Sequence, residues 1–282
     1  MLLPQNINEK EKIKMAKKNN TVLMTKNLSD IFYHMKAVND LQIIGGGKQI
    51  NEIKEKSICI RNIDELKTID KKERYIDIGS EVTLNTLLSL GENKIPKILF
   101  DAVSSISNFS VRNLATIGGN ICSKDFYYTL YSPLHALEAR LEFKNQTETH
   151  YIPFSKFNEI PKGCILTKIR IPLEDWDVQI FKRVGPENII NELSSSYSFL
   201  MQSQKDTVYN INICYAGKVL FDCQDLENKL IGTHLPISSK YIEKTLEDAK
   251  ELYEKKFELY EVQPIVKKQF FQLLKYSLEQ LM

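Results

Sequence analysis

Two glycine turns carry the residue types in this chain that are best suited to binding an anion. Gly118 and Gly119 follow an apolar run and precede Asn120, and without side chains they let the backbone turn tightly. Successive amide N–H groups at such a turn can approach a phosphate group. A pair of glycines also fits a plain turn between two strands, so this stretch by itself leaves both interpretations open.

The second glycine run, Gly45–Gly47, comes directly after an apolar segment. It differs from the phosphate loop of ATPases, because Gln42 stands where that motif needs its first glycine and Gln49 where it needs Ser or Thr. It also differs from the dinucleotide-binding Rossmann turn, whose third glycine is replaced by Ile50. What remains is a loop whose amides, with the ammonium of Lys48, can hold phosphate oxygens, or equally a strand-to-strand turn with a solvated lysine.

Alternating strands and amphipathic helices are expected to position these turns. Helices are indicated by apolar residues at helical spacing behind a capping residue, and strands by alternation or short apolar runs. The expected helices run from Asn27 or Ser29 to about Val38, from Thr83 to Gly91, from Pro96 past Ile106, from Thr129 to Arg140, from Ser238 or Ser239 to Phe257, and from Pro264 to Leu281. The expected strands are 41–44, 57–60, 75–78, 141–143, 165–172, 180–184, 208–213 and 218–221. The layout is a sheet backed by helices.

Composition narrows the classes of function. The 282 residues suffice for two domains, and 38 Lys and Arg against 36 Asp and Glu leave a net charge of only +2, which gives no broad field to recruit nucleic acid. The lysine-rich residues 1–20 lack the apolar core of a secretory signal, and no segment approaches the roughly 18 apolar residues of a membrane span. We therefore expect a cytoplasmic protein without a membrane span.

Cysteine and histidine spacing gives no metal site. The five cysteines contain no Cys-x-x-Cys pair, and the four histidines do not have the spacing of metal ligands. The Gly-x-Ser-x-Gly elbow of hydrolases is absent as well. Any redox chemistry must therefore use a cofactor other than a metal cluster held by this chain.

Taken together, these segments resemble the FAD-binding subunit of molybdenum hydroxylases, the family of multi-subunit xanthine dehydrogenase and of the carbon monoxide dehydrogenase medium subunit. The resemblance runs from Leu23 onward and is strongest over 75–121. Its most specific part is 112–121, which matches the family's second FAD loop almost residue for residue. Further similar segments are 43–50, the counterpart of the first FAD loop, and 165–172 with 181–183, the counterparts of the C-terminal module.

The resemblance implies an α+β protein. A two-subdomain FAD-binding fold of the PCMH type would occupy 21–161, with subdomains of about 21–62 and 63–161. A smaller α/β C-terminal domain over 162–282, with a sheet packed on helices, would follow. Residues 1–20 would be a polar N-terminal extension.

The same resemblance implies which residues hold FAD. Backbone groups of both turns would grip the cofactor, Ile165 and Leu166 would form a wall beside the adenine or flavin, and Lys182 would stabilise the negative charge of reduced flavin. The expected cofactor-binding residues are Gly45, Gly46, Gly47, Lys48, Gln49, Thr116, Ile117, Gly118, Gly119, Asn120, Thr129, Ile165, Leu166 and Lys182. No catalytic side chain is expected, because FAD itself would carry the electrons.

Two stretches depart from the family pattern. The first loop of the family continues Gly-Gly-Thr-Asp, whereas this chain has Lys48 and Gln49 after its glycines. After the second loop the family has Ala-Ser-Pro-Ala-Gly-Asp, whereas 124–129 here is bulky and aromatic. These rings can stack on an isoalloxazine ring or fill its space.

By this resemblance the chain relays electrons within a hetero-oligomer. Iron–sulfur clusters on a partner subunit would supply electrons through FAD to NAD or another acceptor, and a molybdopterin subunit would transform the substrate. Two alternatives stay open: a flavin-poor structural subunit of such a complex, and a stand-alone FAD oxidoreductase of the same fold.

Overall fold

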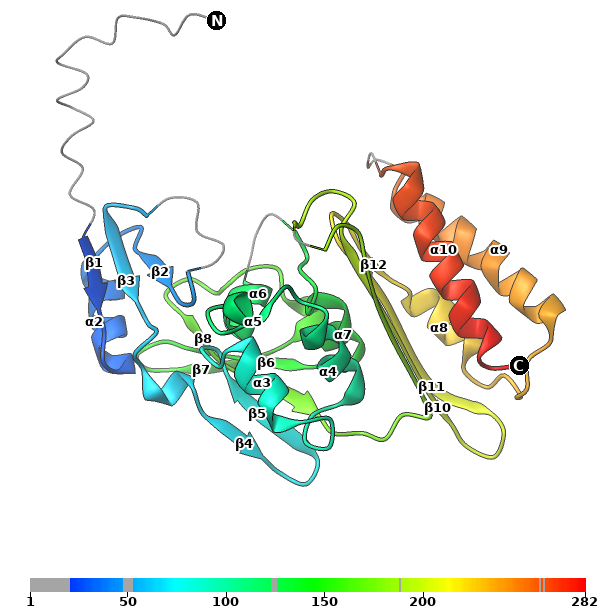
Figure 1. Cartoon of the computed structure of the whole chain (residues 1–282), viewed down its shortest axis with the longest axis horizontal. Helices are drawn as coiled ribbons and strands as arrows, with labels where there is room; N and C mark the ends of the chain where they lie inside the picture. The colour runs from blue at the N-terminus through cyan, green and yellow to red at the C-terminus, as the bar shows by residue number, and fades with distance from the viewer. Residues whose placement is uncertain (1–20, 48–52, 123–125, 188, 259, 261) are drawn as a thin grey trace, which may run out of the picture.

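Three sheets follow one another along the long axis of the molecule (Figure 1). The structure, a computed structural model, describes residues 21–47, 53–122, 126–187, 189–258, 260 and 262–282. Within these residues no helix is long and apolar enough to cross a membrane. The expected helix-and-strand organisation is confirmed.

The first sheet is small and parallel, and it carries the first glycine turn. Its strands lie in the order β1 (Thr21–Met24), β3 (Lys56–Cys59) and β2 (Gln42–Ile44). Helix α2 (Leu28–Ala37) connects β1 to β2, and it begins as expected where the side chain of Asn27 accepts the N–H of Asp30 at 2.9 Å. Ile31 of this helix packs with Ile58 of β3, so this unit has a core of its own.

The second sheet is antiparallel and carries the remaining turns of the site. Its strands lie in the order β4 (Ile69–Lys71), β5 (Tyr75–Gly79), β8 (Ile165–Pro172), β6 (Arg140–Lys144) and β7 (Thr149–Pro153). Short helices separate β5 from β6: α3 (Leu84–Leu90), α4 (Lys97–Ser104), α5 (Phe109–Arg112), α6 (Ile117–Ile121) and α7 (Tyr131–Ala136). The 3-10 turns η1 (Asp64–Leu66) and η2 (Phe154–Lys156) precede β4 and follow β7.

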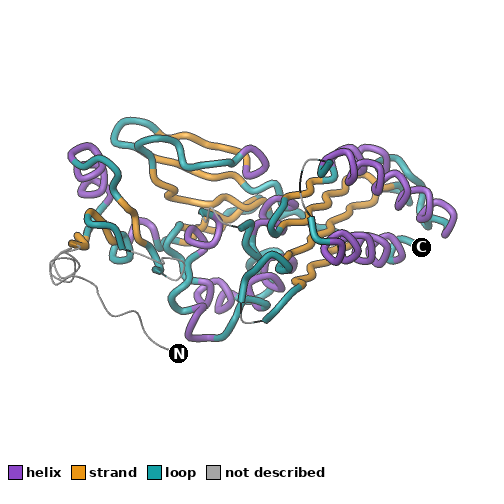
Figure 2. Tube along the Cα trace, turned by 90° about the horizontal axis from the view of Figure 1, so that it is seen from above, coloured by secondary structure: helices purple, strands orange, loops and turns teal. Residues whose placement is uncertain are grey.

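The third sheet lies between two layers of helices (Figure 2). Its antiparallel strands are β12 (Leu220–Asp222), β11 (Val208–Ala216), β10 (Ser195–Ser203) and β9 (Val178–Val184). Helices α8 (Gln224–Leu230), α9 (Ser239–Lys256) and α10 (Pro264–Glu279) cover one face, and α4 and α7 pack against the other. Ser238 caps α9, as expected.

Several details differ from the sequence predictions. Strand β8, which we expected to open the C-terminal domain, pairs with β5 and β6, so a boundary after residue 161 would cut the second sheet. Strand β10 was not expected, because its four serines conceal the apolar pattern. Helix α7 begins at Tyr131 behind Leu130, with no side-chain cap, so the expected cap by Thr129 is wrong.

Candidate functional site

The first glycine turn lies against two other turns of the chain. A Cβ at Gly45 would come within 2.2 Å of Oε1 of Glu81. A Cβ at Gly46 would come within 2.0 Å of the carbonyl oxygen of Leu114, a distance that no real Cβ contact shows. Glycine is therefore required at position 46 for the two backbones to approach each other.

The amides of the first turn donate no hydrogen bond to the described part of the chain. Among the described residues, the N–H groups of Gly45, Gly46 and Gly47 have no hydrogen-bond acceptor. Gly47 has a φ of 71°, in the left-handed region that favours glycine. Lys48 and Gln49, which we expected to extend this turn, lie outside the described residues. The turn has the donor pattern of an anion-binding site.

The second glycine turn is the first turn of helix α6. The hydroxyl of Thr116 caps the helix by accepting the N–H of Gly119 at 3.1 Å. The N–H of Ile117 donates to Val82 O at 3.0 Å, and that of Gly118 donates to Ser80 O at 2.9 Å. These amides are thus already satisfied inside the chain, in contrast to the free donors expected from the sequence.

Gly118 joins the second turn to the turn after β5. A Cβ at Gly118 would lie 2.7 Å from Ser80 O, whereas one at Gly119 would meet only Thr116 Oγ1, at 3.1 Å. We expect Gly118→Ala to destabilise the fold by about 2 kcal/mol through overpacking. Gly119→Ala should change stability by no more than about 0.5 kcal/mol, because Ala relieves the helix penalty of Gly. Urea unfolding of both variants followed by circular dichroism tests the difference; equal stabilities would contradict it.

The turn after β5 supplies two polar side chains that the list of expected site residues omits. Ser80 and Glu81 stand between β5 and α3, held by hydrogen bonds from Ser80 N to Thr167 O (3.0 Å) and from Glu81 N to Leu66 O (2.9 Å). Ser80 Oγ and Glu81 Oε2 are buried without a hydrogen-bond partner among the described residues. The available sequence signal was a carboxylate placed directly after a buried strand.

Burial also sets the protonation of Glu81. The residue is 5% exposed. Burial raises the pKa of Glu81 to about 7, while the charges of Arg61 and Lys67 lower it and offset part of this effect. This carboxyl therefore changes charge near neutral pH, beside an amide-lined turn.

Asn120 secures the chain after the second turn. Asn120 is buried, and its Oδ1 accepts the N–H of Leu130 at 3.2 Å. Thr129, which precedes Leu130 in the sequence, is also buried. Farther along the surface, Tyr127 N donates to Gly217 O at 2.9 Å, and the Tyr127 ring packs edge-on against Tyr131 with centroids 4.5 Å apart. The aromatic run is thus attached to the third sheet.

The remaining residues that we expected to contact FAD, Ile165, Leu166 and Lys182, lie in separate parts of the structure. Ile165 is buried with Ile58 in the core of the small parallel unit, and Leu166 is buried in the central core. Their contact with an adenine or flavin stays a prediction. Lys182 of β9 lies beside Tyr197 in register, on the face covered by α10, with its Nζ 5.7 Å from the centroid of the Tyr276 ring. This placement gives no support to a role of Lys182 beside the flavin.

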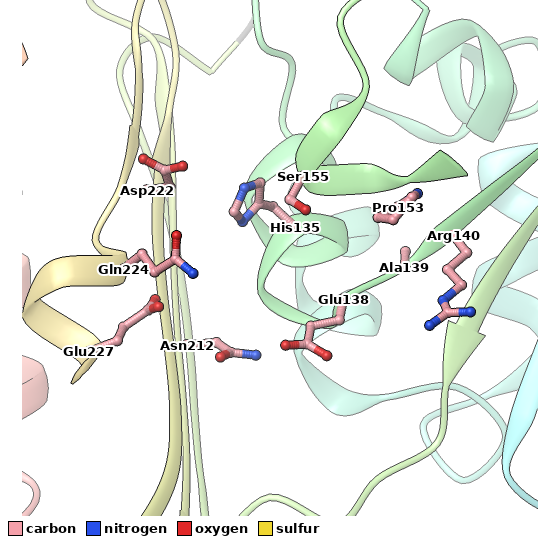
Figure 3. A pocket seen from close by; sticks show the side chains of 10 residues that line it. All are labelled: His135, Glu138, Ala139, Arg140, Pro153, Ser155, Asn212, Asp222, Gln224 and Glu227. Carbon is pink, nitrogen blue, oxygen red and sulfur yellow. The ribbon is translucent and has the colours of Figure 1, made fainter. Parts of the chain in front are cut away.

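A separate polar cavity of about 280 Å³ lies between α7 and the third sheet (Figure 3). His135, Glu138, Asn212, Asp222 and Glu227 are among the residues that line it. Burial, chiefly, lowers the pKa of His135, so its imidazole is neutral at pH 7. No group of His, Cys, Asp or Glu in the described residues has the arrangement to hold a metal ion.

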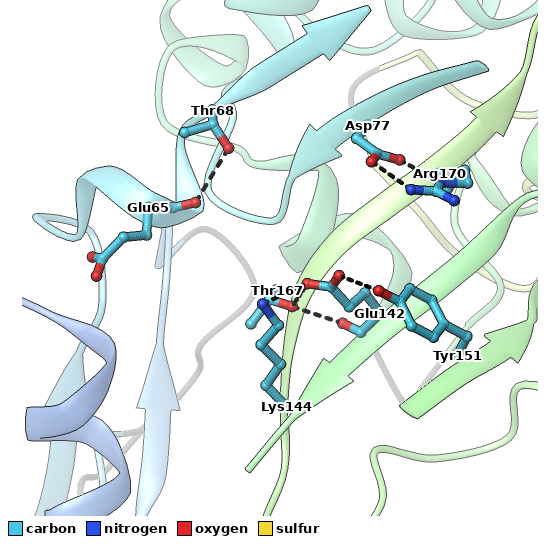
Figure 4. A network of polar contacts seen from close by, with 8 residues as sticks. All are labelled: Glu65, Thr68, Asp77, Glu142, Lys144, Tyr151, Thr167 and Arg170. Carbon is cyan, nitrogen blue, oxygen red and sulfur yellow. Dashed lines mark hydrogen bonds and ion pairs between the residues drawn. The ribbon is translucent and has the colours of Figure 1, made fainter. Parts of the chain in front are cut away.

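A network of polar contacts on the second sheet supports the Ser80 turn (Figure 4). Thr167, whose carbonyl accepts Ser80 N, donates its hydroxyl to Oε1 of Glu142 at 2.6 Å, and Tyr151 donates to Oε2 at 3.0 Å. Burial raises the pKa of Glu142, but these two hydrogen bonds together with the charge and hydrogen bond of Lys144 outweigh it and hold the pKa below its usual value. The site therefore rests on an ionised, fully hydrogen-bonded carboxylate.

An adjacent ion pair joins β5 to β8. Arg170 donates from Nε and from one terminal nitrogen to the two oxygens of Asp77, at 2.7 and 2.8 Å, and Asp77 is only 9% exposed. We expect Arg170→Met to destabilise the fold by about 2 kcal/mol, because it leaves a buried carboxylate without its partner. Urea unfolding measures this loss. Lys97→Met, which breaks the exposed pair with Asp101, is the control and should cost less than about 0.5 kcal/mol. Equal losses of stability in the two variants would show that the burial of Asp77 does not determine the cost of breaking its ion pair.

The described residues fit the diphosphate of a dinucleotide at the first turn. The amides of Gly45–Gly47 and the buried Ser80 hydroxyl have no hydrogen-bond partner among the described residues, and a Cβ at Gly46 would collide with Leu114 O. The Thr116–Asn120 turn fits a different task, because its amides are satisfied by the chain. It is joined to the turn after β5, through the hydrogen bond from Gly118 N to Ser80 O, rather than adding free donors.

The comparisons with known proteins agree with this geometry. Residues 16–174, more than half of the chain, match the sequence profile of a family described as the FAD binding domain in molybdopterin dehydrogenase. The glyceraldehyde dehydrogenase medium chain of Sulfolobus acidocaldarius is 23% identical over 186 residues, which cover 62% of this chain and 66% of that protein. The xanthine dehydrogenase FAD-binding subunit of Escherichia coli O157:H7 is 26% identical over 152 residues, 53% of this chain and 49% of the relative.

A solved structure gives the same fold over almost the whole chain. A carbon monoxide dehydrogenase from Hydrogenophaga pseudoflava superposes with a TM-score of 0.79 at 17% sequence identity, over 92% of this chain and 96% of the other. The expected α+β fold is thereby confirmed. On the profile match and the fold, this chain belongs to the family of FAD-binding flavoprotein domains of the molybdopterin dehydrogenases, which are oxidoreductases.

Proposed function

We propose that this chain is the FAD-binding electron-transfer subunit of a multi-subunit molybdenum hydroxylase. The observation that carries the proposal is the set of close contacts that joins three turns around free amides: Gly45 to Glu81, Gly46 to Leu114, and Gly118 to Ser80. Such contacts are needed only where backbone must approach backbone or a ligand. Family membership supports FAD as that ligand.

The chain's own groups would bind and orient the cofactor. The amides of Gly45, Gly46 and Gly47 would donate to the diphosphate, and the backbone of Leu114, which lies against Gly46, would hold the turn in place. Ile165 and Leu166 are proposed to exclude water beside the rings. Bound FAD supplies a two-electron store between one-electron donors and a hydride acceptor.

The proposed complex includes partners for the other steps. The sequence has no clustered cysteines, so we place the iron–sulfur clusters on one partner subunit and the molybdopterin on another. NAD or another acceptor would receive the electrons. All five cysteines are free thiols, which supports a reducing compartment such as the cytoplasm.

The purified full-length chain tests the cofactor directly. After incubation with FAD and desalting, we expect about one FAD per chain and a flavin absorption spectrum altered from that of free FAD. No uptake of FAD would remove the electron-transfer role and leave a structural subunit. Affinity purification from the native cell tests the assembly; recovery of a lone flavin-containing monomer would instead favour a stand-alone oxidoreductase.

A further inference from the structure

Glu81 is the one acidic group that the described part of the site places directly against the first glycine turn. Its carboxyl occupies the space beside Gly45, and its residue is 5% exposed. Its Oε2 has no hydrogen-bond partner among the described residues. A buried carboxylate oxygen normally has such a partner, so this oxygen lacks a hydrogen bond that would stabilise negative charge on it.

The turn beside Glu81 is suited to binding an anion, but a negative charge on Glu81 opposes that binding. The free amides of Gly45–Gly47 attract a diphosphate, whereas an ionised carboxylate next to them repels it. In a buried site such repulsion is poorly screened. The conflict disappears when Glu81 carries a proton.

Charged and titratable groups from neighbouring segments act on Glu81. Arg61, after β3, and Lys67, after η1, act on it through their positive charges and not through a hydrogen bond to Oε2. Cys122, after α6, is influenced by Glu81, but burial raises the pKa of this thiol to about 12 and keeps it neutral. Glu81 is therefore the group that can change charge near pH 7.

We propose that Glu81 takes up a proton when the diphosphate of FAD binds, so that cofactor binding is coupled to protonation of this residue. The proposal rests on the proposed function. In the free protein Glu81 is divided between its neutral and ionised forms near pH 7, and in the FAD-bound protein it is neutral. The dissociation constant of FAD then rises as the pH rises.

The direction of this pH dependence follows from the linkage between FAD binding and protonation of Glu81. Below the pKa of Glu81 the free protein already holds the proton, so the affinity for FAD does not depend on pH. Above it, binding must draw a proton from solvent, and the dissociation constant rises by up to about tenfold for each pH unit. FAD itself keeps a constant charge between pH 6 and 8.5, so the slope reports the protein.

The test is a fluorescence titration of the full-length apo chain with FAD from pH 6 to 8.5. The wild-type dissociation constant should rise by about tenfold or more over this range. Glu81→Gln, which is neutral at every pH, should bind FAD with a flat profile and should bind it more tightly than wild type at pH 8.5. Glu227→Gln is the matched control, because burial also raises the pKa of Glu227 to about 7, yet Glu227 lies at the separate polar cavity. In the Glu227→Gln variant the dissociation constant of FAD should depend on pH as it does in the wild type.

Calorimetry of the wild-type chain gives a second measurement that needs no variant. Titrations in two buffers of different ionisation enthalpy should show uptake of about half a proton per FAD at pH 7. FAD binding with no proton uptake, or with the same pH slope in Glu81→Gln as in wild type, would overturn the coupling alone. Absence of FAD binding at every pH in both proteins would overturn the proposed function as well.

Discussion

Gly46→Ala is expected to weaken FAD binding by about 100-fold, the equivalent of about 3 kcal/mol. The added methyl group would stand 2.0 Å from the carbonyl oxygen of Leu114, and both groups belong to backbone that cannot swing aside as a side chain can. The first turn must therefore move away from Leu114, which lies between α5 and α6. Because its free amides move with it, the donors no longer converge on one anion.

Titration with FAD, followed by the change in flavin fluorescence, measures the effect of Gly46→Ala. Gly91→Ala provides the control, since Gly91 has a φ of 82° at the end of α3 and no atom within 4 Å of its added Cβ. That variant should lose about 1 kcal/mol of folding stability through backbone strain but keep its affinity for FAD. Wild-type affinity in Gly46→Ala would show that the approach of the two turns is not what creates the site.

Replacing Glu227 by Gln is expected to stabilise the protein at alkaline pH and not at acidic pH. Burial raises the pKa of Glu227 from 4.5 to about 7, although the hydrogen bond from Ile213 N opposes the shift. The pKa of Glu227 is higher in the folded state than in the unfolded state. Its contribution to folding stability is therefore complete below about pH 4.5 and lost by about pH 7. At pH 8 this loss approaches about 3 kcal/mol, and Gln removes it while still accepting the Ile213 N–H.

Urea unfolding of wild type and Glu227→Gln at pH 4.5 and pH 8 checks this prediction. The stability difference between the two proteins should grow by about 2 to 3 kcal/mol from the lower to the higher pH. Asp225→Asn is the control, because Asp225 is an exposed carboxyl on the same helix. A difference that does not change with pH would mean that Glu227 is solvated in the folded protein.

Local signals in the sequence predicted helices well because the groups that start them are close in the chain. Asn27, Thr83 and Ser238 each cap the helix expected after them, through an acceptor that lies three residues from its donor. The same kind of signal was present at Thr116, three residues before Gly119. It was not used, because two adjacent glycines disfavour a helix and were interpreted as a loop.

Long-range pairing set the limits of the sequence predictions. The pattern of β8 predicted a strand correctly, but no local feature shows that it pairs with β5, about ninety positions earlier in the chain. Glu81 presented a similar problem, because it lies against Gly45, in the turn that follows β2 of the first sheet. The position of Lys182 depends in turn on the strand register that sets it beside Tyr197. In each case the deciding contact joins residues that the sequence does not bring together.

The central core contains residues from both halves of the chain. Leu200 and Cys214 of the third sheet are fully buried in the same apolar cluster as Ile169 and Leu134, and the hydroxyls of Ser132 and Ser198 lie 2.9 Å apart across this junction. The stretch that matches the family profile ends at residue 174, yet its apolar surface is covered by strands that come later. The limits of the inherited module and of the cooperative folding unit therefore differ. Excised at that point, the flavin half would expose to water the surface on which its own folding depends.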